Sequence, residues 1–232
     1  MTKFKTDVPG WMTEVDLNVL YKLASMVPDE GSILELGCFL GRSTSALFNG
    51  KSSTVKLTVV DSFEPLTMYS PQVDIFQIRI NETHGGKYVD AYGSRELYAA
   101  AQELTKLTGN WLAGFRHCVG DDIFTNIDLH QAYSADFKLD ENGYNLAFID
   151  ASHVKEDVVN DISKFINNNK TLIVGDDFDP KHMNGVISAL VEVRKRNKHL
   201  LIVPENSKLW MLVPMEGYWK EQFRNTNSCF FD

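Results

Sequence analysis

The sequence feature that most constrains the fold is an alternation of short apolar runs with helical segments along most of the chain. Apolar runs at residues 32–36, 55–60, 144–149 and 171–174 each end at a glycine or an aspartate, and a weaker run lies at 115–119. Residues 16–26, 43–48 and 154–166 instead show helical character. Because parallel strands are joined by helical crossovers, the pattern predicts an α/β fold, a doubly wound and mostly parallel sheet with helices on both faces.

The last part of the sequence departs from this pattern. Apolar runs at residues 200–203 and 209–213 flank a short polar connection, a spacing that predicts an antiparallel hairpin at the end of the sheet. The basic cluster at 194–198 is interpreted as a helix end, where cations offset the helix dipole.

Composition indicates a globular protein with one core. At 232 residues, a single domain spanning 1–232 is expected. No apolar run approaches the length of a bilayer span, and residues 1–10 lack a secretion leader, so we expect a cytoplasmic protein without membrane association. The net charge of −8 argues against a nucleic-acid partner. The oligomeric state is left open, with a homo-oligomer among the alternatives.

A long segment at about residues 62–114 interrupts the alternation. Its signals are mixed, with a helix-like run at 94–107. Connections of this length inside a compact α/β domain are usually functional. We therefore expect an insertion that covers a substrate, and the identity of the substrate to depend on it.

The strongest candidate site is a glycine turn between the first apolar run and the helix that follows it. The turn runs from Glu35 to Ser43 and contains Gly37 and Gly41. Glycines allow a tight turn and close approach of a ligand, and a helix N-terminus offers free N–H groups to an anion. The Gly-x-x-x-Gly spacing differs from that of hydride-transfer enzymes and favours a methyl donor. An ordinary strand-to-helix turn is the alternative.

Acidic residues after later strands extend this site. Asp61 ends the second apolar run at the distance from the turn expected of a carboxylate that binds ribose hydroxyls, and Ser62 adjoins it. Asp121, with Asp122 beside it, follows the weak run at 115–119 and is expected at the same sheet edge, accepting from an adenine amino group. Capping and turn formation are the alternative roles for these aspartates.

A second group of side chains indicates chemistry beside the cofactor. Asp150 and the pair Asp176 and Asp177 end two successive strands, so a doubly wound sheet brings them to one edge. Clustered carboxylates suit Mg²⁺ or Mn²⁺, which can lower the pKa of a substrate hydroxyl. His153 lies three residues beyond Asp150 and is the candidate proton acceptor. The alternatives are helix capping and turn formation.

Four segments together resemble class I S-adenosylmethionine-dependent methyltransferases. They are ILELGCFLGRST, LTVVDSF, NLAFIDASHVKEDVVNDI and TLIVGDDF, and their order and spacing are closest to methyltransferase family 24, the branch of macrocin O-methyltransferase and cephalosporin hydroxylase-like proteins. The resemblance implies a Rossmann-like, seven-stranded sheet. It also implies cofactor contacts by Glu35, Gly37, Gly41, Ser43, Asp61 and Asp121, and metal ligation by Asp150, Asp176 and Asp177.

The resulting hypothesis is a metal-assisted O-methyltransferase that uses S-adenosyl-L-methionine. Its acceptor is expected to be a hydroxylated small molecule, a sugar or a natural product, with His153 and Asp150 as the catalytic side chains. The alternative is a non-catalytic module on the same fold that binds a nucleotide-like ligand or a partner, because a fold does not fix a function. A non-heme iron oxygenase would need two histidines and one carboxylate, which this cluster matches poorly.

Overall fold

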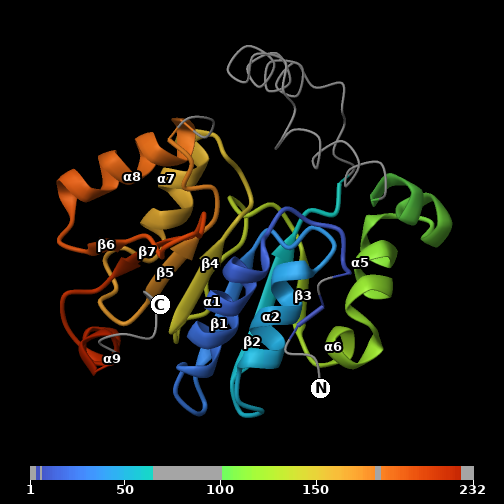
Figure 1. Cartoon of the computed structure of the whole chain (residues 1–232), viewed down its shortest axis with the longest axis horizontal. Helices are drawn as coiled ribbons and strands as arrows, with labels where there is room; N and C mark the ends of the chain where they lie inside the picture. Colours follow the sequence, from blue (N-terminus) through green and yellow to red (C-terminus); the bar gives the residue numbers. More distant parts are fainter. Residues whose placement is uncertain (1–3, 6, 65–100, 181–183, 226–232) are drawn as a thin grey trace.

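The described strands of the computed structural model form one seven-stranded sheet in the order β3-β2-β1-β4-β5-β7-β6 (Figure 1). The structure describes residues 4, 5, 7–64, 101–180 and 184–225. Its strands are β1 (Ser32–Leu36), β2 (Lys56–Asp61), β3 (Asp128–Gln131), β4 (Leu146–Ile149), β5 (Leu172–Gly175), β6 (Leu200–Ile202) and β7 (Trp210–Val213). Its helices are α1 (Glu14–Ser25), α2 (Arg42–Gly50), α5 (Trp111–Val119), α6 (Asp121–Thr125), α7 (Lys155–Ser163), α8 (Asn184–Arg196) and α9 (Tyr218–Asn225).

Strands β1 to β5 pair in parallel, and β7 runs antiparallel to its two neighbours, which confirms the expected sheet and its terminal hairpin. β1 pairs in parallel with β2 and β4, and β4 pairs in parallel with β5. β7 then runs antiparallel to both β5 and β6. The predicted basic helix end is also confirmed, since α8 carries Arg194, Lys195 and Arg196 in its last turn.

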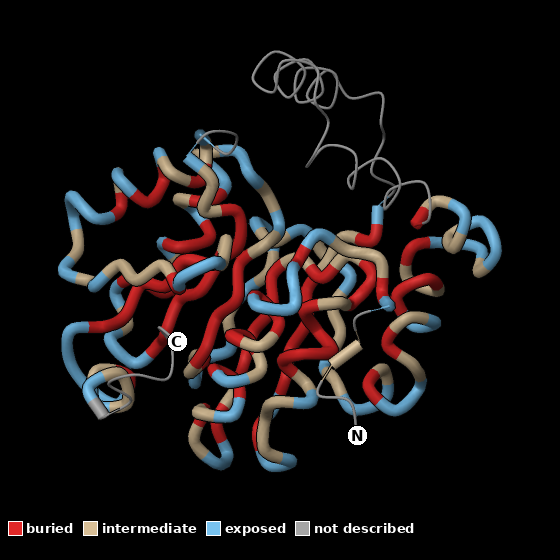
Figure 2. Tube along the Cα trace, viewed as in Figure 1, coloured by how far each residue is buried: buried red, intermediate tan, exposed pale blue. Residues whose placement is uncertain are grey.

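Successive residues of each central strand pack into hydrophobic cores on opposite faces of the sheet. In β1, Ile33 joins the core that contains apolar residues of α1, α2 and α5. Leu34 and Leu36 join the core that contains those of α7 and α8. Alternation of side chains along a strand produces this division. The sheet is therefore a buried layer between helices, as the red segments of Figure 2 show, and its strand ends are left for function.

One predicted strand is wrong. Residues 115–119 belong to α5, and the third strand of the sheet is β3. Trp111, Phe115 and Val119 are spaced by four residues and are all buried, which is the pattern of a helix face rather than a strand. β3 has no apolar run that predicts a strand, because none of its four residues is fully buried.

Most of the predicted insertion lies outside the described residues, so its role as a substrate cover stays a prediction. At its ends, residues 101–108 are helical and α5 begins at Trp111. Among the helices of the described ranges, none is long and apolar enough to cross a membrane.

Candidate active site

The parallel strands bring four of the candidate residues to one edge of the sheet. Gly37, Asp61, Asp150 and Asp176 lie at or just beyond the carboxyl ends of β1, β2, β4 and β5. Strain is concentrated here, because Phe39, Phe63 and Asp177 all have positive φ values between 50° and 65°. Non-glycine residues adopt this conformation at a cost and cluster at functional sites.

Gly37 joins the glycine turn to the acidic cluster. Its φ is 84°, and a Cβ placed on it would lie 2.3 Å from the carbonyl oxygen of Asp150 and 2.7 Å from Cα of Ala151. The turn after β1 therefore packs directly on the backbone after β4. Any side chain at position 37 would push the two candidate sites apart.

Gly41 is required for a different contact. It precedes α2 with a φ of 89°, and a Cβ there would lie 2.2 Å from Cγ1 of Val119 and 2.9 Å from Cε2 of Phe115. The glycine thus allows α5 to pack against the start of α2. Its part in cofactor binding stays a prediction.

Glu35 and Ser43 bind each other inside the protein. The Glu35 carboxylate is fully buried and accepts hydrogen bonds from Oγ of Ser43 at 2.5 Å and Oγ1 of Thr44 at 2.7 Å. Burial raises the pKa of Glu35 to about 8, although the two hydroxyls oppose the shift. These contacts hold the first turn of α2 against β1, so both residues position the turn. A direct cofactor contact by either remains a prediction.

Asp61 fixes the turn from the neighbouring strand. Its Oδ2 accepts hydrogen bonds from the backbone N–H groups of Cys38 at 2.9 Å and Phe39 at 3.0 Å, and its Oδ1 accepts one from Phe63 at 2.8 Å. A carboxylate held by three N–H groups is locked in place with its charge at the sheet edge. Ser62, the next residue, accepts a hydrogen bond from the Gln131 side chain at its carbonyl oxygen, which makes the end of β3 part of this edge.

Asp121 and Asp122 do not reach this edge, which corrects their expected placement. They begin α6, which immediately precedes β3 and so lies near the amino end of that strand. Figure 1 shows α6 at the opposite end of the sheet from the loop after β2. Asp121 is 75% exposed and pairs with Arg116 at 2.8 Å. Their expected placement depended on a strand at 115–119, and that segment is a helix.

Aromatic side chains border the glycine turn, a feature that the sequence reading missed. The Arg42 guanidinium donates to the carbonyl oxygens of Val8 at 2.8 Å and Met12 at 2.9 Å, and so holds this N-terminal segment beside α2. The Phe39 ring then lies 5.1 Å from that of Trp11 and 5.4 Å from that of Trp111. Three apolar rings therefore line one side of the turn.

The acidic side chains lie close together, with His153 among them, and their role as metal ligands stays a prediction. Nε2 of His153 lies 2.7 Å from Oδ2 of Asp177 and 3.8 Å from Oδ1 of Asp150. One ligand atom from each of these three residues lies within 4.8 Å of the others, a grouping that can hold a metal ion. This grouping contains His153, whereas the sequence reading had placed Asp176 with Asp150 and Asp177.

Lys208 is a member of the cluster that the sequence reading missed. Its Nζ lies 3.3 Å from Oδ1 of Asp177 and 3.6 Å from Oδ2 of Asp176. The hairpin connection was predicted to end at this residue, but its proximity follows only from the pairing of β7 with β5. An apolar run and its flanking lysine carry no signal for that pairing.

The charges of the cluster perturb one another. Loss of solvation at the crowded sheet edge alone would lower the pKa of His153, but the neighbouring carboxylates of Asp150 and Asp177 raise it to about 10. Burial would raise the pKa of Asp177, yet His153 and Lys208 lower it to about 2. Burial and the neighbouring carboxylates raise the pKa of Asp176 to about 8. In this arrangement the two carboxylates favour the protonated form of His153, which is an acid rather than a base.

The residues present fit a hard divalent cation. Asp176 is 4% exposed, and its Oδ1 has no hydrogen-bond partner among the described residues. Beside it lies a cavity of about 10 Å³ lined in part by Asp150, His153 and Asp176, close to the least space that holds one water molecule. Ile149, Val158, Val186 and Trp210 also line this cavity, so the carboxylates lie on one side of it. Carboxylate oxygens are the ligands that Mg²⁺ and Mn²⁺ prefer.

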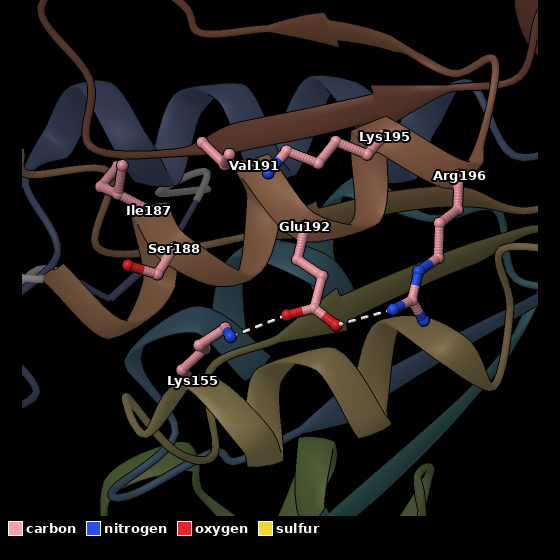
Figure 3. Close-up of a pocket in the computed structure, with 7 residues that line it drawn as sticks. All are labelled: Lys155, Ile187, Ser188, Val191, Glu192, Lys195 and Arg196. Carbon is pink, nitrogen blue, oxygen red and sulfur yellow. Dashed lines mark ion pairs between the residues drawn. The ribbon is translucent and has the colours of Figure 1, made fainter.

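A larger hollow, of about 450 Å³, lies away from the sheet edge. It is lined by Lys155 and by one face of α8, and it includes the exposed Val191. Figure 3 shows Lys155 and Arg196 reaching Glu192, with ion pairs of 2.7 and 3.4 Å. These charges are paired and neither the glycine turn nor an aspartate of the cluster lines the hollow, so we do not place the active site there.

Comparison with solved structures identifies the fold. The chain is similar to a protein from Corynebacterium glutamicum, with a TM-score of 0.54 at 12% identity over 91% of this chain and 85% of that one. It is also similar to the O-methyltransferase NovP, with a TM-score of 0.50 at 11% identity over 87% and 80% of the two chains. The calicheamicin methyltransferase CalS11 gives 0.50 at 13% identity over 86% and 77%.

The chain has the Rossmann-like fold of class I methyltransferases. No protein-family model matches it, and no curated protein does. Because these identities lie between 11% and 13%, the likeness establishes the fold, and activity must be argued from the site.

Proposed function

We propose that the chain is an S-adenosylmethionine-dependent methyltransferase that methylates a hydroxyl group of a small molecule. The observation that carries this proposal is the packing of Gly37 on the backbone of Asp150 and Ala151. It makes the glycine turn and the acidic cluster neighbours at one sheet edge. A cofactor held at the turn would therefore lie beside groups able to position an acceptor.

The glycine turn would hold the methyl donor. The N-terminus of α2 presents backbone N–H groups suited to the carboxylate of S-adenosylmethionine. Glu35 of β1 fixes the orientation of that helix through its hydrogen bonds to Ser43 and Thr44. Asp61 is rigidly held and places a negative charge where ribose hydroxyls would donate. The O-methyltransferase NovP and the calicheamicin methyltransferase CalS11 share the fold, which supports a methyltransferase.

The acidic cluster would hold Mg²⁺ or Mn²⁺ through Asp150, Asp176 and Asp177. When bound, such an ion lowers the pKa of an acceptor hydroxyl. His153 keeps its proton through Asp150 and Asp177, so it would serve as a base only once these carboxylates bind other groups. His153 is 49% exposed and can then reach a proton on an acceptor. The charged and polar side chains at this edge support a hydroxylated acceptor such as a sugar or a natural product.

Transfer of a labelled methyl group tests this proposal. The protein would be incubated with methyl-labelled S-adenosylmethionine and a panel of sugars and phenols, with Mg²⁺ or with EDTA. We expect transfer that EDTA reduces at least tenfold. Asp177→Ala should have a similar effect, and Asp136→Ala, at an exposed position on a loop outside the cluster, should not. Full methyl transfer by Asp177→Ala in the presence of EDTA would contradict the proposed role of the metal ion.

Cofactor binding without transfer to any acceptor would instead favour a non-catalytic ligand-binding module.

A further inference from the structure

The backbone of Lys208 is fixed opposite Asp177 by the register of the sheet. β5 and β7 are antiparallel with Gly175 paired to Trp210, so continuing that register places residue 177 across from residue 208. The Phe178 N–H donates to the Lys208 carbonyl oxygen at 2.7 Å. On the other side, the Lys208 N–H donates to Oδ1 of the buried Asp16 at 3.1 Å. These backbone contacts therefore position Lys208 beside the acidic cluster.

The Lys208 side chain occupies oxygens that a metal ion would need. Its ammonium contacts Oδ1 of Asp177 and Oδ2 of Asp176 at 3.3 and 3.6 Å. The second oxygen of Asp177 is bound to His153. Both oxygens of Asp177 are therefore engaged. Of the four carboxylate oxygens of Asp176 and Asp177, Oδ1 of Asp176 has no hydrogen-bond partner among the described residues.

A lysine in this position can also leave it. The ammonium is held at one end of a flexible four-carbon stem, and the Lys208 side chain is 35% exposed. Rotation of the stem would move the charge to solvent while the backbone stays bound to Phe178 and Asp16. No rearrangement of the sheet is needed to free the carboxylates.

We propose that the Lys208 ammonium competes with a divalent cation for Asp176 and Asp177 and thereby weakens metal binding at this site. The inference rests on the metal site of the proposed function and adds an internal competitor to it. A divalent cation bound to these oxygens would repel the ammonium beside it, because close like charges repel strongly in a partly buried site. The carboxylates are then always neutralised, by the lysine or by the metal.

Mn²⁺ binding to the full chain tests this inference without any turnover. The dissociation constant for Mn²⁺ would be measured by titration calorimetry and by the electron paramagnetic resonance signal of free Mn²⁺, without cofactor or acceptor. Lys208→Met removes the charge and keeps the length of the side chain. We expect it to bind Mn²⁺ at least tenfold more tightly than the wild type, a change of about 1.4 kcal/mol.

Two variants control for fold and for overall charge. Lys164→Met also removes a lysine from a buried ion pair, here with Asp161 at 3.1 Å near the far end of α7, and should leave Mn²⁺ affinity within about twofold. Lys208→Arg keeps the positive charge and should bind Mn²⁺ as weakly as the wild type. If Lys208→Met does not fold by circular dichroism, Lys208→Gln replaces it with the same expectation.

The outcomes separate this inference from the proposed function. Equal Mn²⁺ affinity of wild type and Lys208→Met would overturn the competition and leave the metal site intact. Absence of Mn²⁺ binding by both would overturn the metal site and the competition together. Binding of S-adenosylmethionine by the wild type is measured separately and tests the methyltransferase proposal in either case.

Discussion

Replacing Gly37 with alanine tests whether the glycine turn and the acidic cluster are built as one unit. Gly37 has a φ of 84°, and a Cβ there would lie 2.3 and 2.6 Å from the carbonyl oxygen and carbon of Asp150. These are backbone atoms that cannot rotate away. Gly217 is a matched control, because its φ is 80° and the nearest atom to an added Cβ, the carbonyl oxygen of Asn169, is 3.6 Å away.

The two variants differ by the clash alone. Placing alanine in the left-handed region costs roughly 1–2 kcal/mol at either position. The overlap at position 37 adds roughly 1–3 kcal/mol, as for overpacking elsewhere in a well-packed interior. We therefore expect Gly37→Ala to lower the free energy of unfolding by about 2–5 kcal/mol and Gly217→Ala by about 1–2 kcal/mol.

Urea unfolding followed by circular dichroism measures both free energies. Titration calorimetry with S-adenosylmethionine supplies a second readout, in which Gly37→Ala should bind at least tenfold more weakly and Gly217→Ala should bind as the wild type does. Equal destabilisation of the two variants, with unchanged cofactor affinity in both, would refute the close packing of the turn on Asp150.

Three further substitutions test other parts of the site. The pKa of Glu35 is raised from 4.5 to about 8, so its contribution to stability is present below pH 4.5 and is lost as the pH rises to 8. Glu35→Gln should remove this loss. Between pH 4.5 and 8, the free energy of unfolding of the variant minus that of the wild type should therefore rise by roughly 3–5 kcal/mol, as measured by urea unfolding. A difference that stays constant with pH would contradict the raised pKa. Asp61→Asn places an amide donor against backbone N–H groups. It should lower the free energy of unfolding by about 1–3 kcal/mol and weaken cofactor binding tenfold or more. Wild-type values of both quantities would contradict the role of Asp61. Asp121→Ala, at the other end of the sheet, should leave cofactor affinity within twofold, and a larger loss in calorimetry would restore its predicted contact.

Most of the sheet could be predicted because its strands are short, continuous and apolar. β1, β2, β4 and β5 are buried on both faces, and each therefore stands out as an apolar run bounded by glycine or aspartate. β3 lies at the sheet edge with half-exposed and polar residues, so it carries no such signal. Residues 115–119 resemble a strand because they are short and partly apolar, and the helical spacing becomes visible only when Trp111 is included with Phe115 and Val119.

The glycine turn and the aspartates could be located from sequence because parallel strands end at a common edge. The side-chain contacts of these residues could not be predicted from sequence. Asp61 binds the turn, Glu35 binds α2, and His153 binds Asp177, and each of these pairings depends on side-chain directions that strand ends alone do not specify. Lys208 was missed for the same reason, since its partners are set by the register of an antiparallel pair.

Titration of the wild-type protein with S-adenosylmethionine by calorimetry tests the central claim most directly. If the glycine turn between β1 and α2 is a cofactor site, the protein should bind one equivalent with a dissociation constant in the micromolar range, and Gly37→Ala should weaken that binding. Absence of binding at millimolar cofactor would contradict the account, whatever the state of the metal site.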